Sequence, residues 1–316
     1  MMKKIFRTPL RVLYAGTVFF AFQTAITAYV NSTAMREYLR GSDVGIIYSS
    51  SALLTILGLY LIPHALKKFG NYKTSLFLIS VSLISLTIIA TIRHQSVLLF
   101  FIIYLMTNTL ISYCLDIFIE HHSETETTGQ TRGVYMTIIN TAWVCAPLLA
   151  GVLATKYIFS VYLLAGLTTL PLLLVLIAKF SKFKDAHYDH ISFRKTFVRL
   201  LNSKNLRNIF TSNFLLHFFY SWMVVFSPLY LVNELGATWT EVGIIFTIML
   251  LPFALFEYPF GKIADKKIGE KELLILGFLI ISISTALFAF SPGASLVMLT
   301  LILFLTRTGA SMVEIM

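Results

Sequence analysis

Polar side chains recur at helical spacing within four of the most apolar stretches of this 316-residue sequence. Separations of three or four residues place the members of each group on one face of a helix. The groups are Gln23, Thr27 and Asn31; Asn108, Ser112, Asp116 and Glu120; Asn213, His217 and Tyr220; and Arg307, Ser311 and Glu314. Amides, hydroxyls and a cation on such faces can bind a small solute, and carboxylates can carry protons. We therefore interpret these residues as a substrate and ion pathway.

The stretches that contain these groups are long enough to cross a membrane. The chain is 57% hydrophobic and only 13% charged, about half the charged fraction of a soluble domain. A bilayer-spanning helix needs about 20 apolar residues. Ten such spans are predicted, at 10–31, 43–65, 74–92, 96–119, 133–155, 157–178, 208–232, 241–263, 273–290 and 294–314. Because polar groups are costly in lipid, those inside spans default to functional roles.

Basic residues indicate the orientation of the spans. With a cytoplasmic N-terminus, 20 of the 25 Lys and Arg residues fall in inside segments, four fall outside and Arg307 lies within a span. This bias follows the positive-inside rule. Basic loops facing anionic lipid then account for the net charge of +10, so we expect a lipid partner and no nucleic acid. The expected location is the plasma membrane.

Short motifs repeat at an almost constant distance along the chain. The four pairs are "FFAF" and "FFYS" from Phe19 and Phe218, "DVGIIY" and "EVGIIF" from Asp43 and Glu241, "ALKKFG" and "ADKKIG" from Ala65 and Ala264, and "TNTLIS" and "TRTGAS" from Thr107 and Thr306. Three pairs are offset by 199 residues and one by 198. A parallel repeat of this kind is typical of transporters whose two halves alternate access to a central site.

The repeat predicts the domain organisation. We expect an N-terminal six-helix bundle at 1–179, a cytoplasmic linker at 180–207 and a four-helix C-terminal bundle at 208–316. Met316 corresponds to Ile117, which two further spans follow in the first half. We therefore expect the chain to be a fragment of a twelve-span protein, with a natural ten-span protein as the alternative.

The loop after the eighth span contains the most informative motif. "GKIADKKIGEK" supplies Gly261, Asp265, Lys266, Gly269 and Lys271 and resembles the loop signature G-x-x-x-D-R/K-x-G-x-R/K of the major facilitator superfamily, with the second glycine one residue late. This resemblance covers essentially the whole chain. It implies an all-α membrane fold of two pseudo-symmetric bundles, and a loop that latches the halves at the cytoplasmic side.

The fifth span carries a second partial match. "AWVCAPLLAG" resembles the family's antiporter signature G-x-x-x-G-P-x-x-G-G, with Ala142, Ala146, Pro147, Ala150 and Gly151 in register. Small residues at this spacing also let two helices approach closely. Antiport and ordinary helix packing therefore both remain open for this segment.

The resemblance implies that spans one, four, seven and ten line a central cavity, and these are the spans with polar stripes. A desolvated Asp116 is a candidate proton carrier, and the remaining candidates for coupling are Glu120, Glu257 and Glu314. Arg307 is expected to bind an anionic substrate or to pair with an acid such as Asp116. Asn108 stands where the family has an arginine, which departs from a standard drug–proton route.

The favoured function is a secondary transporter of a small solute, with proton-coupled efflux as its finer form. A membrane-embedded enzyme and a channel or non-transporting receptor are the alternatives. An enzyme would gather catalytic residues at one membrane face, and none is identified in the sequence. We expect no metal site and no cofactor, a small-molecule substrate with protons as a second partner, and a monomer.

Overall fold

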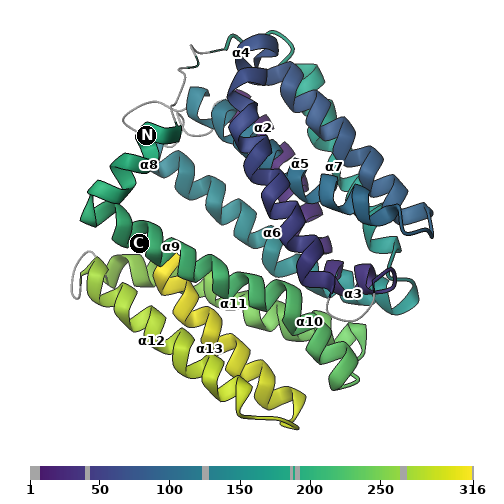
Figure 1. Cartoon of the computed structure of the whole chain (residues 1–316), viewed down its shortest axis with the longest axis vertical. Coiled ribbons are helices and arrows are strands. Elements are labelled where there is room, and N and C mark those ends of the chain that lie inside the picture. The colour runs from purple at the N-terminus through teal and green to yellow at the C-terminus, as the bar shows by residue number, and fades with distance from the viewer. Residues whose placement is uncertain are drawn as a thin grey trace. The chain divides into compact units, whose positions relative to one another are not determined.

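The computed structural model describes residues 8–39, 43–122, 128–185, 188, 193–263 and 269–314. Within these residues every regular element is a helix, and the chain separates into two compact units (Figure 1). Unit 1 comprises Met1–Ala142 and Lys156–His190, and unit 2 comprises Trp143–Thr155 and Ile191–Met316. The predicted boundaries at 179 and 208 stay a prediction.

Unit 1 contains most of the helices of the first six predicted spans. They are α2 (Thr8–Ala28), α3 (Asn31–Arg36), α4 (Val44–Thr91), α5 (Val97–His122), the first part of α6 (Thr128–Lys156) and α7 (Ser160–Lys179). The first predicted span, 10–31, ends earlier than expected. Because the chain turns after α2, Asn31 begins α3 and does not continue the helix face of Gln23 and Thr27.

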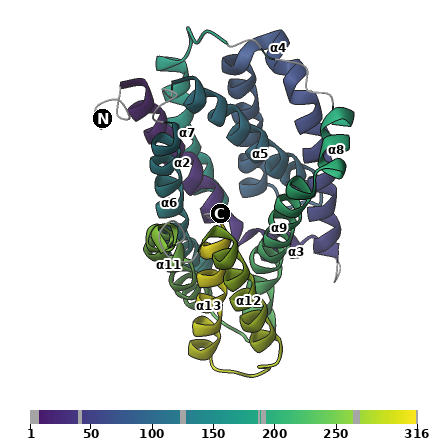
Figure 2. The ribbon, with the colours of Figure 1, turned by 90° about the vertical axis from the view of Figure 1, so that its left-hand side faces the viewer.

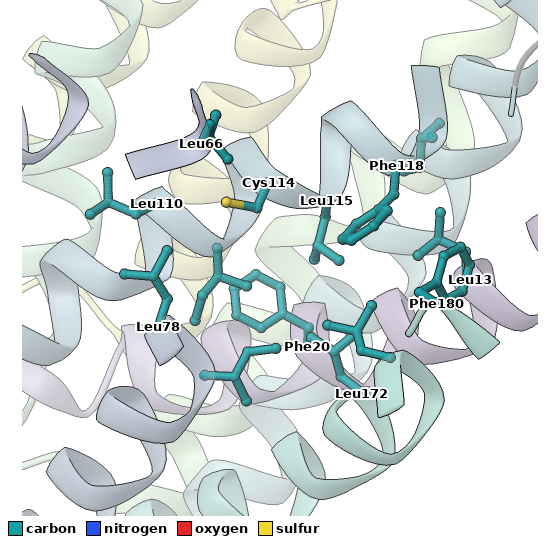
Figure 3. Close-up of a cluster of buried hydrophobic side chains, with 14 of the residues drawn as sticks. Leu13, Phe20, Leu66, Leu78, Leu110, Cys114, Leu115, Phe118, Leu172 and Phe180 are labelled. Carbon is teal, nitrogen blue, oxygen red and sulfur yellow. The ribbon is translucent and has the colours of Figure 1, made fainter. Parts of the chain in front are cut away.

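The core of unit 1 is an apolar cluster to which α2, α4, α5 and α7 contribute (Figure 3). Its members include Leu13, Phe20, Leu115, Phe118 and Leu172, all buried. Between membrane helices, such contacts stabilise mainly by van der Waals packing, since lipid tails are as apolar as leucine. The cluster therefore specifies how the helices of this unit fit together.

Helix α4 contains two predicted spans, 43–65 and 74–92. Its 48 residues would extend about 70 Å as one straight helix, against a hydrocarbon core of about 30 Å. Gly70 interrupts it with φ 78° and ψ 163°, a conformation that side chains with a Cβ disfavour. One glycine thus makes the turn between two membrane crossings.

Unit 2 contains the helices of the four later spans together with the C-terminal part of α6. The elements are α8 (Phe193–Asn202), α9 (Lys204–Ser221), the π-helical η3 (Trp222–Phe226), α10 (Ser227–Leu229), the π-helical η4 (Tyr230–Glu234), α11 (Trp239–Ile263), α12 (Glu270–Ala289) and α13 (Leu296–Glu314). Helices α12 and α13 lie side by side in Figures 1 and 2. Span seven therefore comprises α9, η3, α10 and η4.

Nine helices among the described residues are long and apolar enough to cross a membrane. Because α4 holds two of the predicted spans on either side of Gly70, all ten predicted spans fall on helical segments. The predicted all-α membrane fold is thereby observed.

Candidate functional site

Unit 1 contains a buried hydrogen-bond network among the predicted polar stripes. Gln23 Nε2 donates to the Tyr104 hydroxyl at 2.7 Å, and Thr27 Oγ1 lies 2.7 Å from the same hydroxyl. A second phenol, Tyr162, donates to Asn31 Oδ1 at 2.8 Å. We call these five residues the unit 1 polar cluster. It joins α2, α3, α5 and α7 through neutral groups alone.

Seven buried side-chain polar atoms in unit 1 have no hydrogen-bond partner among the described atoms: Gln23 Oε1, Asn108 Oδ1, Ser32 Oγ, Thr33 Oγ1, the Tyr48 hydroxyl, Asn71 Oδ1 and Ser82 Oγ. The first two are acceptor oxygens on the stripes of spans one and four. A buried acceptor that lacks a donor costs about 1–3 kcal/mol. Because an apolar replacement would remove this cost, the two oxygens are candidates for contact with a solute, and their role stays a prediction.

The remaining stripe of α5 runs from buried to exposed positions. Asn108 is 8% exposed. The Ser112 hydroxyl donates to the Asn108 backbone carbonyl oxygen at 3.1 Å. Asp116 and Glu120 follow on the exposed part of the helix. The predicted helix face is therefore observed, and the carboxylates occupy its exposed end.

Unit 2 presents a buried cation enclosed by aromatic rings. Arg307 is 3% exposed, and its guanidinium carbon lies 5.5, 4.9 and 5.7 Å from the ring centroids of Phe219, Tyr220 and Phe253. We call these four residues the arginine cage. Cation–π contacts contribute about 2 kcal/mol or more when desolvated. The rings on α9 and α11 therefore hold the α13 cation inside the unit.

Tyr220 links the arginine cage to a candidate coupling carboxylate. Its hydroxyl donates to Glu314 Oε2 at 2.5 Å, across α9 and α13. Glu314 itself is exposed, whereas Glu257 on α11 is half-buried. One predicted substrate residue, Tyr220, thus contacts both the cation and an acid of span ten.

The other predicted residues of spans seven and ten divide between buried and exposed positions. Ser311 is fully buried and its hydroxyl donates to the Thr308 carbonyl oxygen at 2.8 Å. Asn213 and His217 are exposed, and His217 Nδ1 lies 3.0 Å from the Asn213 carbonyl oxygen. The span-seven stripe therefore reaches the cage only at Tyr220.

Helices α6 and α11 pack with almost no space between their backbones. A Cβ on Gly151 would collide with the Trp239 carbonyl oxygen, and one on Gly243 would lie 2.7 Å from the Pro147 carbonyl oxygen. Ala142, Ala146 and Ala150 are buried on α6 as well. Within the span-five motif of Ala142, Ala146, Pro147, Ala150 and Gly151, Pro147 and Gly151 thus lie in close contact with α11. The motif's role in antiport stays a prediction.

A glycine of the loop motif has nearly the same backbone angles as the glycine at the repeat-equivalent position of unit 1. Gly269, the N-cap of α12, has φ 96° and ψ 153°, close to the values of Gly70, 199 residues earlier. Gly261 lies on α11 and Lys271 is exposed on the first turn of α12. Asp265 and Lys266 lie outside the described residues, so the predicted latch stays untested.

An acid lies against each of these two glycines. The Asn71 backbone N–H donates to Asp185 Oδ1 at 2.7 Å, and the Tyr188 hydroxyl donates to the same oxygen at 2.6 Å. Burial raises the pKa of Tyr188, and the hydrogen bond to Asp185 raises it further. In unit 2 the corresponding acid is Glu272, within α12 itself.

The sequence stripes omitted four residues that complete these sites: Tyr104, Tyr162, Phe219 and Phe253. Tyr104 precedes Asn108 by four residues, so extending that stripe by one turn would have included it. Nothing in the spacing of polar residues indicates Tyr162 or the two phenylalanines. Within the described part of the chain, no three His, Cys, Asp or Glu side chains gather in a metal-binding arrangement.

The helices, the repeat-related glycines and the buried polar groups define a polytopic membrane protein built from a duplicated helical unit. Residues 13–316 match the family model described as Major Facilitator Superfamily. The chain belongs to this superfamily of transporters, which confirms the predicted family and fold class. A search of curated protein sequences gave no significant match.

Solved structures support the same fold. The crystal structure of a D-xylose-proton symporter has a TM-score of 0.64 and 14% identity, covering 95% of this chain and 79% of that one. The partially occluded inward open conformation of the xylose transporter XylE from E. coli has a TM-score of 0.63 and 16% identity, covering 98% of this chain and 85% of that one. At such low identity the likeness concerns the fold alone.

Proposed function

We propose that the protein is a secondary active transporter that moves a small solute by alternating access. The observation that carries this proposal is the placement of buried polar groups on repeat-equivalent spans. Asn108 of span four and Arg307 of span ten occupy equivalent positions of the repeat, and each lies in its unit's interior. Polar groups on equivalent helices of two halves suit a solute held between them.

The chemistry of the two sites suggests what the solute offers. The unpartnered oxygens of Gln23 and Asn108 complement O–H or N–H donors, and Arg307 complements an anionic or strongly electronegative group. The similar solved structures are named for D-xylose, a hydroxylated solute. We propose a small hydroxyl-bearing solute.

The coupling and direction of transport form a finer proposal. Asp116 lies on the same helix face as Asn108, and a proton on this carboxylate would couple its gradient to solute movement. The likeness of the span-five motif to the antiporter signature supports export. We propose proton-coupled efflux across the plasma membrane, with a cytoplasmic N-terminus and a monomeric protein.

The test is transport into and out of vesicles that contain the purified protein, under an imposed pH gradient. A panel of radiolabelled sugars, polyols and their anionic derivatives serves as substrate. Arg307→Ala is expected to lower flux by about tenfold or more, because several cation–π contacts are lost. Asp116→Asn is expected to abolish the dependence on the pH gradient while leaving solute binding intact.

The matched control is Ser80→Ala, at an exposed position of α4 whose hydroxyl bonds only within its own helix. Flux through this variant should equal that of the unmodified protein. If neither Asp116→Asn nor Arg307→Ala changes the flux, the proposed site is wrong. Absence of flux for every solute, with a monodisperse protein, would contradict transport itself.

A further inference from the structure

Helix α8 has the pattern of a helix that lies on a membrane surface. At about 100° per residue, Phe197, Leu200 and Leu201 fall within an arc of about 100°. Lys195 and Arg199 fall on the opposite side. A strongly amphipathic helix with basic residues on its polar face and large apolar residues on the other is typical of the lipid–water interface.

The apolar face of α8 is partly exposed in the structure. On this face Phe197 is 49% exposed and Leu201 is 50% exposed, whereas Leu200 is half-buried. Val198, beside this face, is 47% exposed. The exposed area of these side chains can therefore contact a partner that accepts apolar groups.

The position of α8 in the chain places it at the end of a membrane span. Ser203 separates it from α9 with extended backbone angles, φ −105° and ψ 113°. The Ser203 hydroxyl accepts the Leu206 N–H at 3.4 Å, and Arg207 Nη1 donates to the Leu201 carbonyl oxygen at 3.0 Å. These bonds fix the bend by which α8 joins α9, and α9 continues as an apolar span to Glu234 (Figure 2).

The charges around this bend have a single sign. Between Phe193 and Arg207 the chain has five basic residues and no Asp or Glu: Arg194, Lys195, Arg199, Lys204 and Arg207. Basic residues next to the end of a membrane span interact with anionic lipid headgroups. The exposed apolar side chains and the positive charge of α8 therefore match the same partner.

We propose that α8 is an interfacial helix that inserts Phe197 and Leu201 among lipid chains while Arg194, Lys195 and Arg199 bind anionic lipid headgroups. The partner is the bilayer in which α9 is embedded, since the bend at Ser203 makes α8 continuous with that span. This inference goes beyond transport and does not depend on the identity of the solute. It gives unit 2 an attachment that varies with the lipid composition of the leaflet.

The test is the accessibility of spin labels in the full chain reconstituted into vesicles. Cys114 and Cys145 are first replaced by alanine, and single cysteines are introduced by Leu201→Cys or Lys195→Cys. The label at 201 should meet membrane-soluble oxygen more often than a water-soluble nickel chelate, and the label at 195 should show the reverse. Adding phosphatidylglycerol to phosphatidylcholine vesicles should raise the docked fraction at 201.

The charge requirement is tested with the label at 201 and glutamine at three positions: Arg194→Gln, Lys195→Gln and Arg199→Gln. At about fivefold for each basic side chain, the ratio of docked to undocked helix should fall by about a hundredfold in vesicles with phosphatidylglycerol. Lys182→Gln with Lys184→Gln removes two exposed linker charges outside α8 and should change nothing. Size-exclusion elution of each variant shows that it is folded.

Three results would overturn the proposal. The first is a label at 201 that is exposed to the water-soluble chelate in every vesicle composition. The second is a label at 201 that is shielded from both probes, as it would be when packed on protein. The third is a docked fraction that is equal with and without phosphatidylglycerol. The expected pattern of all three measurements supports the anionic bilayer surface as the partner.

Discussion

Unit 1 and unit 2 use equivalent spans of a repeat in different chemical ways. Around spans one and four, Gln23, Thr27 and Tyr104 form a buried network of neutral groups. Around spans seven and ten, the buried group is the Arg307 guanidinium, enclosed by three rings. The scaffold is nevertheless shared, since Gly70 and Gly269 adopt nearly the same backbone angles. The turns at these two repeat-equivalent positions are thus alike, whereas the interior side chains of the two units differ.

The largest expected change in the free energy of unfolding distinguishes two glycines at matching positions of the repeat. Gly243 and its counterpart Gly45 belong to the matching "VGII" segments, yet only Gly243 touches another helix. Gly243→Ala and Gly151→Ala should each lower the free energy of unfolding by about 1–3 kcal/mol through overpacking. Gly45→Ala, with nothing within 4 Å of its Cβ, should leave stability unchanged or raise it by up to about 1 kcal/mol.

Thermal unfolding of the purified protein in detergent measures this contrast. Equal melting temperatures for Gly45→Ala and Gly243→Ala would contradict the close contact between α6 and α11.

A second contrast concerns the glycines with positive φ. Gly70→Ala should cost about 1–3 kcal/mol, because φ 78° with ψ 163° is a backbone conformation adopted almost only by glycine, and more because the new Cβ meets Asp185. Gly236→Ala, at φ 66° in open space, should cost only the backbone part. The excess at Gly70 should disappear when Asp185→Ala is present as well, and an unchanged excess in the double variant would argue against the collision.

Removing one hydroxyl from each unit gives a smaller effect. Tyr104→Phe leaves Gln23 Nε2 without its acceptor and should cost about 1 kcal/mol, since interhelical hydrogen bonds in membrane proteins average about 0.6 and reach about 1.7 kcal/mol. Tyr220→Phe keeps the ring beside Arg307 and should cost less. Melting temperatures of the two variants provide the comparison, and a larger loss for Tyr220→Phe would reverse the assignment of the tighter network to unit 1.

The smallest expected difference in stability is between two acids that lie at the start of a helix, one from a distant part of the chain and one from the helix itself. Asp185 reaches the N-terminus of the helix after Gly70 from a position more than a hundred residues away, whereas Glu272 belongs to the first turn of α12. Asp185→Ala should cost about 1 kcal/mol, as for a lost N-terminal cap. Glu272→Ala should cost about 0.3–1 kcal/mol, as for a charge beside a helix dipole. Denaturation in mild chaotrope can resolve the difference, and equal losses would mean that the Asn71 hydrogen bond contributes nothing beyond charge.

The sequence predicted the features that repeat within one helix. Apolar length located the spans, and spacing of four residues placed Asn108, Ser112 and Asp116 on one face of α5. Contacts between helices were not predictable from spacing. Phe219 and Phe253 approach Arg307 from separate helices, and in an apolar sequence neither phenylalanine differs from its neighbours.

The spacing of polar residues also did not predict where a helix is interrupted. In the sequence Asn31 continues the four-residue spacing of Gln23 and Thr27, but the chain turns after α2. Asp185 lies far along the chain from Gly70, so only the fold brings its carboxylate to that turn. Local periodicity therefore gave the helix faces, and tertiary contacts decided which side chains meet.

The π-helical segments on either side of α10 have a consequence for the rotation of span seven. A π turn contains about one residue more than an α turn, so it advances the following side chains by about 100° around the helix axis. With η3 before Pro228 and η4 after it, the residues beyond Trp222 are no longer in phase with Tyr220. Residues before η3, between the two π segments and after η4 therefore differ in phase around the axis. Moving a π turn along the chain by one residue would re-orient only the side chain that it passes, whereas converting it to α geometry would turn all following residues by about 100° without breaking the span.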